Sequence, residues 1–155
     1  MSIFVKMVFR ILATDTTVDF DAYLKEYLSQ YPETNIIIGC DSKNRDNETV
    51  YGLVIVLYKE KKGGHVLFAK ERVPRIRDRW SRLWREVEMS VALANELQEK
   101  GFPKAQFIDL DLNPDPRYKS NDVVRAAVGL VESMGYQART KPYSLCASYA
   151  ADKVC

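Results

Sequence analysis

The stretch FIDLDLNP, residues 107–114, places two carboxylates, Asp109 and Asp111, in a run that otherwise has the apolar character of a buried strand. Side chains two apart on a strand share one face of the sheet. Two explanations need no chemistry, because a strand can expose one face and an aspartate near a strand end can open a turn. The alternative is that these carboxylates belong to a larger acidic cluster.

Acidic residues elsewhere in the chain would complete such a cluster. Asp41 follows the apolar run NIIIGC, Glu86 lies among helical positions that face a sheet, and Asp152 lies on a short helical segment. Neighbouring carboxylates repel each other unless they are protonated or hold cations, and ligation by oxygen alone favours Mg²⁺ or Mn²⁺. The candidate metal ligands are Asp41, Glu86, Asp109, Asp111 and Asp152; all of them except Asp109, whose role stays ambiguous, are also candidate catalytic residues.

Two such cations about 4 Å apart can activate a water on one side of a phosphodiester and stabilise the leaving oxygen on the other. The sequence therefore predicts a metal-dependent nuclease that acts on RNA or DNA by a two-metal-ion mechanism. Lys119, Asn121 and Lys141 are the candidate substrate-binding residues. A non-catalytic module that binds nucleic acid or protein on the same scaffold stays open, because fold does not fix function.

The elements that must position these residues follow from periodicity and from end signals. Asp19 precedes a helix that stops before Pro32, and a long amphipathic helix runs from Trp80 to Gly101. Further helices are expected from Ser120 or Asn121 and over 145–154. Strands are expected over 35–40, 50–60, 65–73, 105–112 and 136–142, the second and third of them forming a hairpin around Gly63-Gly64.

The predicted order βββαβαβα, after a helical lead-in, indicates an α/β fold with a mixed five-stranded sheet: three antiparallel strands, then parallel strands, with helices on both faces. Crossover connections place the fourth strand between the first and the fifth. Asp41 and Asp111 would then lie at the carboxyl ends of neighbouring parallel strands, where open α/β sheets bind ligands.

Composition limits the alternatives. A chain of 155 residues, 46% hydrophobic and 28% charged, is expected to form a single domain over 1–155, with residues 1–34 as a strand and helix extension. The net charge of +2 is typical of neither a membrane-surface protein nor a strongly basic nucleic-acid binder. The three cysteines lack CxxC spacing, which argues against a zinc knuckle or a disulfide framework and favours a cytoplasmic location. No membrane partner is expected.

The stretch RVPRIRDRWSRLWR, residues 72–85, combines six arginines with two tryptophans. One interpretation is a phosphate-binding patch with stacking positions. The other is a solvated loop and helix face, with Trp80 and Trp84 in the core. Helical spacing favours the core for the tryptophans, and it leaves both interpretations open for the arginines.

Several ordered blocks resemble one known family. The segments IIIGCDS, RLWREVEMSVALANEL, DLDLNPDPRYKSNDVVRAAVGLVESMGY and KPYSLCASYAADK are similar to the ribonuclease-H-like family of YkuK-type bacterial proteins, a domain of unknown function. The likeness covers about residues 35–153. It implies a ribonuclease-H-like fold with an acidic site for divalent metal ions, and it names no substrate.

The resemblance assigns the acidic residues one by one. Asp41 matches the aspartate of the family's G-T-D-S block, Glu86 the glutamate of its E-V block, and Asp152 the aspartate of its terminal A-D block. Asp111 matches the aspartate of the L-D-V-N-P block, so Asp109 stands where the family commonly has histidine. The chain also departs from the pattern at two positions, with Cys40 for a usual threonine and Tyr143 for a usual acidic residue.

Overall fold

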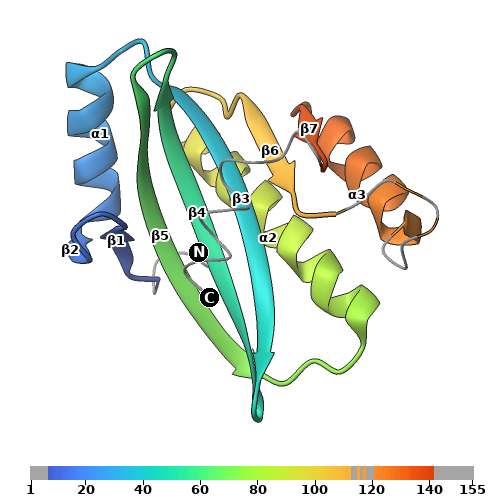
Figure 1. Cartoon of the computed structure of the whole chain (residues 1–155). Coiled ribbons are helices and arrows are strands. Elements are labelled where there is room, and N and C mark those ends of the chain that lie inside the picture. The colour runs from blue at the N-terminus through green and yellow to red at the C-terminus, as the bar shows by residue number, and fades with distance from the viewer. Residues whose placement is uncertain (1–6, 113–114, 116, 118–120, 142–155) are drawn as a thin grey trace.

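The computed structural model describes residues 7–112, 115, 117 and 121–141. In these ranges one sheet has the strand order β2-β1-β5-β4-β3-β6-β7 (Figure 1). The three long strands pair antiparallel in succession, and β6 and β7 then continue the sheet in parallel. The strand bounds are β1 (Phe9–Ile11), β2 (Thr16–Val18), β3 (Asn35–Arg45), β4 (Glu48–Lys59), β5 (Gly63–Pro74), β6 (Phe107–Leu110) and β7 (Ala138–Arg139).

This topology confirms the predicted mixed sheet and the place of β6 between β3 and β7. The prediction of five strands was too low, because β1 and β2 form an additional hairpin that pairs with β5 through Arg10↔Phe68. Each of these two strands has three residues. Alternation over three residues is too short to distinguish a strand from a loop.

The helices predicted before β3, after β5 and after β6 are all present. They are α1 (Phe20–Gln30), α2 (Arg79–Glu99) and α3 (Asn121–Ser133). Asp19 and Asp78 cap the first two, accepting hydrogen bonds from Ala22 N at 3.1 Å and from Ser81 N at 2.9 Å. The helix predicted over 145–154 lies outside the described residues. No described helix has both the length and the apolar composition that a membrane span needs.

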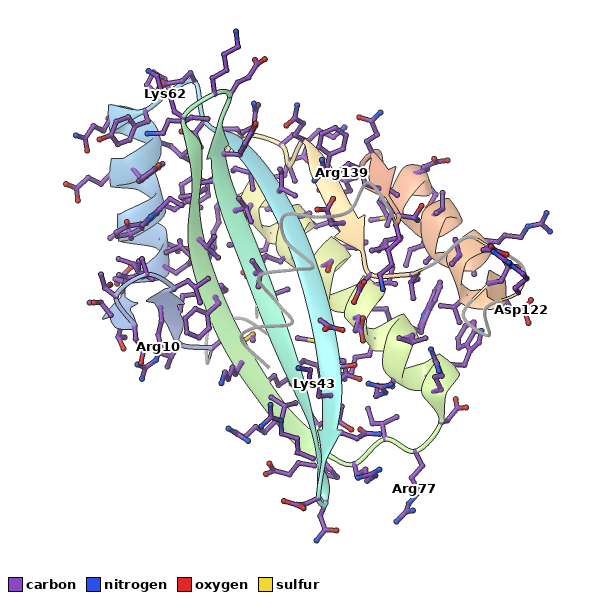
Figure 2. All side chains as sticks on the ribbon, in the orientation of Figure 1. Arg10, Lys43, Lys62, Arg77, Asp122 and Arg139 are labelled. Carbon is purple, nitrogen blue, oxygen red and sulfur yellow. The ribbon has the colours of Figure 1, made fainter. Side chains whose placement is uncertain are left out.

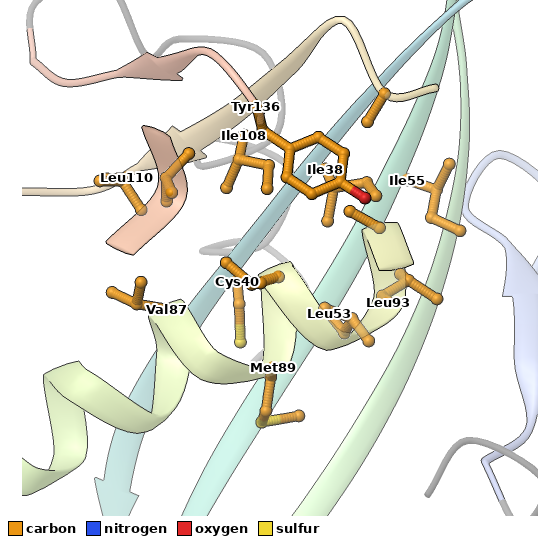
Figure 3. Packing of buried hydrophobic residues seen from close by; sticks show 14 of the residues in the cluster. Ile38, Cys40, Leu53, Ile55, Val87, Met89, Leu93, Ile108, Leu110 and Tyr136 are labelled. Atoms are coloured by element: carbon orange, nitrogen blue, oxygen red, sulfur yellow. The ribbon is translucent and has the colours of Figure 1, made fainter. Parts of the chain in front are cut away.

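The described helices pack on one face of the sheet. Leu24 of α1, Leu93 of α2 and Ala127 of α3 belong to one buried cluster with alternate strand residues such as Ile38 and Ile55. Figure 3 shows α2 laid across this face, with Val87, Met89 and Leu93 beside Ile38, Cys40, Leu53, Ile55, Ile108, Leu110 and Tyr136. On the opposite face, Ile37, Val54, Val56 and Phe68 form a smaller buried cluster. Helices were predicted on both faces of the sheet, whereas those in the described part of the chain pack on one.

The two tryptophans of α2 differ from the prediction of a shared core position. Trp84 packs against the main cluster, as expected, but Trp80 is 45% exposed. The first buried residue of α2 is Leu83. The turn that carries Trp80 therefore extends past the core, although its spacing matches that of the buried residues.

An aromatic contact fastens α1 to the β4–β5 hairpin. Tyr23 Oη lies 2.5 Å from His65 Nε2, and the His65 ring stacks on Tyr27 with 5.3 Å between centroids. The Lys59 ammonium lies 3.7 Å from the centroid of the Tyr31 ring. Burial, with a smaller contribution from Lys59, lowers the pKa of His65 below its usual value of 6.5. The fold thus favours the neutral imidazole.

This contact predicts a pH dependence of stability. As the pH falls below about 6.5, the unfolded chain takes up a proton on His65 before the folded chain does, so the free energy of unfolding decreases. The His65→Gln variant lacks this titration and should lose less stability between pH 7.5 and 5.5 than the wild type. Urea denaturation at both pH values measures the difference. Because His65 is the only histidine, equal losses in the two proteins would contradict the role given to this contact.

Candidate functional site

β6 ends before β3 does, and this creates a notch at one edge of β3. The last pair between the two strands is Cys40↔Leu110, whereas β3 continues to Arg45 with only β4 beside it among the described strands. Asp41 is the first residue of β3 past this pair, and Asp111 is the first residue after β6. The two carboxylates therefore originate on either side of the notch. Asp41, predicted at the carboxyl end of its strand, lies within β3, because this strand continues to Arg45.

α2 supplies a buried carboxylate close to the notch. Glu86 is 5% exposed, and its Oε2 accepts a hydrogen bond from Ser42 Oγ at 2.5 Å. Arg82, one turn earlier on the helix, donates from Nη1 to the Ser42 carbonyl oxygen at 3.0 Å and to Ser42 Oγ at 3.1 Å. These hydrogen bonds tie α2 to the part of β3 that extends past β6.

The charges of Asp41 and Asp111 both act on the Glu86 carboxyl. Burial raises the pKa of Glu86 well above its usual value, and the negative charge of Asp41 raises it further. The Ser42 hydrogen bond and the Arg82 charge oppose this shift, and Asp111 adds a smaller increase. A buried carboxyl group beside two others is unfavourable in its charged form unless a cation compensates it. Asp41 and Asp111 are thus coupled electrostatically to Glu86, and the role of the three carboxylates as a cation site stays a prediction.

Asp109 has a different environment. It is 1% exposed, and Arg139 of β7 binds it through two contacts, Nε to Oδ1 at 2.6 Å and Nη2 to Oδ2 at 2.8 Å. The guanidinium also lies 4.3 Å from the centroid of the Phe107 ring. This paired geometry gives Asp109 a structural role in joining β6 to β7, which the sequence analysis did not foresee.

Lys141 forms an ion pair with Asp111. Its Nζ is 2.9 Å from Asp111 Oδ1, and its backbone N–H donates to the Leu112 carbonyl oxygen at 3.2 Å. The sequence analysis assigned this lysine to substrate, whereas the structure uses it as a counter-ion within the site. Asn121 begins α3 and is half-buried. Two predicted site residues, Lys119 and Asp152, lie outside the described part of the chain.

The donor set suits a hard divalent cation, because Asp41, Glu86 and Asp111 offer only carboxylate oxygens. The side chains are not gathered into a cage: among the residues that the structure describes, no three Asp, Glu, His or Cys side chains lie close enough to hold a metal ion. Glu86 is engaged by Ser42 and Asp111 by Lys141. Metal ligation would therefore require these contacts to rearrange, and the Mg²⁺ or Mn²⁺ cofactor stays a prediction.

Sequence reasoning missed the residues that support the carboxylates, namely Ser42, Arg82 and Arg139. Arg82 had a local signal, because it lies four residues before Glu86 and such pairs meet on a helix surface. Ser42 directly follows Asp41, and alternation alone would have placed it on the helix-facing side. Arg139 had no such signal, because it is thirty residues from Asp109 and lies in a strand of two residues.

A comparison of the sequence with known protein families identifies the family of this chain. The Ribonuclease H-like family model matches residues 19–155. The chain belongs to the ribonuclease-H-like family. This match confirms the family inferred from the sequence blocks, although the narrower likeness to YkuK-type proteins stays a prediction. A search of curated proteins finds no match. The matched region of this ribonuclease-H-like chain contains both sides of the notch and all of α2.

The raised pKa of Glu86 predicts how stability responds to pH in metal-free buffer. The folded state favours the protonated carboxyl, so its stability is full below about pH 4.5 and decreases as the pH rises towards the raised pKa. The Glu86→Gln variant mimics the protonated form and keeps an acceptor for Ser42. It should therefore have a higher Tm than the wild type at pH 8, with a smaller difference at pH 4.5. Glu88→Gln, on the exposed side of α2, is the matched control. Identical pH profiles for the two variants would contradict the cluster.

The pairing of Asp109 with Arg139 predicts an asymmetry between ion pairs. Arg139→Met leaves a buried carboxylate without its partner and should lower the free energy of unfolding by on the order of 3 kcal/mol. The control is Arg117→Met, which breaks a pair of similar geometry whose arginine side chain is 84% exposed and should change little. Urea denaturation at pH 7 compares them. Similar losses in both variants would show that Asp109 does not depend on Arg139.

Proposed function

We propose that this chain is a metal-dependent nuclease that hydrolyses phosphodiester bonds of RNA or DNA, with Mg²⁺ or Mn²⁺ as its cofactor. The observation that carries the proposal is the burial of the Glu86 carboxyl beside the notch, where it is 5% exposed and accepts a hydrogen bond from Ser42. Burial, with smaller contributions from the charges of Asp41 and Asp111, raises its pKa. A buried carboxyl group under the influence of further negative charges is a candidate for a functional, cation-binding role. Membership in the ribonuclease-H-like family is consistent with such a site.

Each acidic residue has a distinct position in the proposed site. Asp41 from β3 and Asp111 from the end of β6 would hold or bridge the cations from the two sides of the notch, and Glu86 would complete the ligand set from α2. Asp152 was predicted to complete the second site. Two bound cations would supply an activated water nucleophile and would stabilise the leaving oxygen.

Three further residues orient these carboxylates or balance their charge. Ser42, which also accepts hydrogen bonds from Arg82, fixes the direction of the Glu86 side chain. A shift of α2 along β3 would break the two hydrogen bonds that Arg82 donates to Ser42 and the one that Ser42 donates to Glu86. Lys141 balances the charge of Asp111. A cation bound at Asp111 would displace this ammonium, which is half exposed, and would leave it free to contact a substrate phosphate.

The second candidate function is a non-catalytic module that binds nucleic acid on the same scaffold. The contact between Lys141 and Asp111 favours it, because a lysine that permanently occupies an acidic position removes the need for a metal ion. The two functions differ in one property that is simple to measure. A nuclease site must bind divalent cations through Asp41 and Asp111, whereas a binding module need not.

The test measures metal binding and cleavage together. In the wild type, Mn²⁺ at about a hundred times its Kd should stabilise the fold by about 2.7 kcal/mol. The protein with Mg²⁺ or Mn²⁺ should also cleave some member of a panel of single-stranded, duplex and hybrid substrates. Asp41→Asn and Asp111→Asn should abolish the Mn²⁺ effect and reduce cleavage at least about a hundredfold, because Asn keeps the shape and removes the charge.

Asp46→Asn is the matched control for these variants. Asp46 is exposed in the β3–β4 turn with φ 51°, a conformation that asparagine tolerates. Its contact with Arg75 uses the backbone carbonyl oxygen, which the substitution leaves unchanged. A wild type that shows neither Mn²⁺ stabilisation nor cleavage, but binds nucleic acid as well as both site variants do, would establish the binding module instead.

A further inference from the structure

Trp80 is the one large aromatic side chain that is exposed in the described part of the chain. It lies in the first turn of α2, and its ring stacks on Trp84 with 5.1 Å between centroids and 19° between planes. Trp84 in turn packs against the core. The core thus supports the outer indole through the inner one, which gives the exposed ring a fixed orientation.

The surroundings of Trp80 are strongly basic. Residues 75–85 contain five arginines and one acidic residue, Asp78. The Asp78 carboxylate is occupied, because it accepts hydrogen bonds from the Ser81 backbone N–H at 2.9 Å and from the Ser81 hydroxyl at 2.5 Å. Arg77 and Arg79 are exposed, and neither forms an ion pair with a described residue. Figure 2 shows the Arg77 side chain projecting from the loop before α2.

The tryptophan pair lies on α2, the helix that also carries Glu86. Glu86 follows Trp80 by six residues, a rise of about 9 Å along a helix. Trp84 shares a stripe of α2 with Asn95, three turns later, whose Oδ1 accepts a hydrogen bond from Tyr136 Oη at 2.8 Å. Tyr136 follows α3, so the pair lies on the side of α2 that faces α3 and β6. This axial offset is comparable to on the order of three nucleotides at the 3.4 Å rise of a stacked strand.

We propose that Trp80, supported by Trp84, is a stacking platform for one base of an unpaired nucleic-acid strand, with Arg77 and Arg79 binding its phosphates. The proposal rests on the nuclease function and narrows its substrate to single strands or single-stranded ends. A polyanion that carries aromatic faces complements both features of the patch, the arginines and the indole. In a duplex, neighbouring bases cover those faces, so the platform discriminates between the two forms.

Binding is measured by fluorescence anisotropy with a labelled twelve-nucleotide oligothymidylate, its oligouridylate counterpart and a mixed-sequence duplex. The buffer contains EDTA, so no metal-dependent cleavage interferes. Trp80→Ala should weaken single-strand binding about tenfold, because stacking of one base on an aromatic ring contributes that order of affinity, and should leave duplex binding unchanged. Replacing Arg77 and Arg79 together with alanine should reduce the slope of log K against log[salt] by about 1.4.

Matched variants separate stacking from apolar contact. Trp80→Phe keeps an aromatic face and should retain most of the affinity, whereas Trp80→Leu keeps an apolar side chain without one and should behave as Trp80→Ala does. Met134→Ala removes another exposed apolar side chain, just beyond α3, and should bind as the wild type does. Circular dichroism and Tm confirm that each variant folds.

The proposal is overturned if Trp80→Ala and Trp80→Leu bind single strands as well as the wild type, or if they lose duplex affinity equally. It is also overturned if sedimentation shows that Trp80→Ala converts a dimer to a monomer, because the patch would then be a contact between copies of the chain. Metal-dependent cleavage without a Trp80 effect would retain the nuclease and reject the platform. Loss of single-strand binding in Trp80→Ala, in a protein that cleaves nothing, would retain the platform and reject the nuclease.

Discussion

The burial of Glu86 is the constraint on which the arrangement of α2, β3 and the notch depends. A carboxyl group that is 5% exposed must have hydrogen-bond partners in the protein, and Ser42 provides one from the strand on which α2 packs. Arg82 holds the same serine, so helix and strand are fixed in one register. The apolar cluster alone would tolerate small sliding movements of α2, because dispersion contacts are not directional. The polar contacts select one position, and that position brings Asp41 and Asp111 within electrostatic reach of Glu86.

Most of the fold could be predicted because its elements are long and strongly patterned. α2 has twenty-one residues and repeats its apolar positions through nearly six turns, and Gly101, with φ +87°, marks its end. The hairpin of β4 and β5 could be predicted equally well, from Gly63 and from the apolar runs on either side of it. Short elements were less predictable. A strand was expected within residues 1–34, but the hairpin of β1 and β2 was not. The described part of the run 136–142 contains a strand of only two residues. Tertiary pairing rather than local sequence defines such short pieces.

The candidate site was predictable at the level of charges and much less so at the level of contacts. Chain order places Asp41 and Asp111 at one edge of the sheet, and helical phase places Glu86 on the buried side of α2. The sequence could not predict that Asp109 is paired with an arginine whereas Asp111 lies at the notch. Arg139 contacts Asp109 across the pairing of β6 with β7, and no local sequence pattern predicts that pairing. Trp80 shows the opposite limit. Its spacing is that of a core residue, yet the first buried residue of α2 is Leu83, and spacing alone does not tell where along a helix burial begins.

The early end of β6 also bears on pairing between the sheets of separate chains. Past Cys40, no described strand covers one side of β3, and uncovered strand edges are where separate chains add to one another's sheets and aggregate. Charged side chains follow this part of β3, namely Asp41, Lys43 and Arg45. The carbonyl oxygen of Ser42 accepts a hydrogen bond from Arg82 and is therefore not free to pair with another strand. The outer strands β2 and β7 are only three and two residues long, too short to template a stable pairing. Charged residues around the notch therefore also disfavour the addition of another strand at this edge.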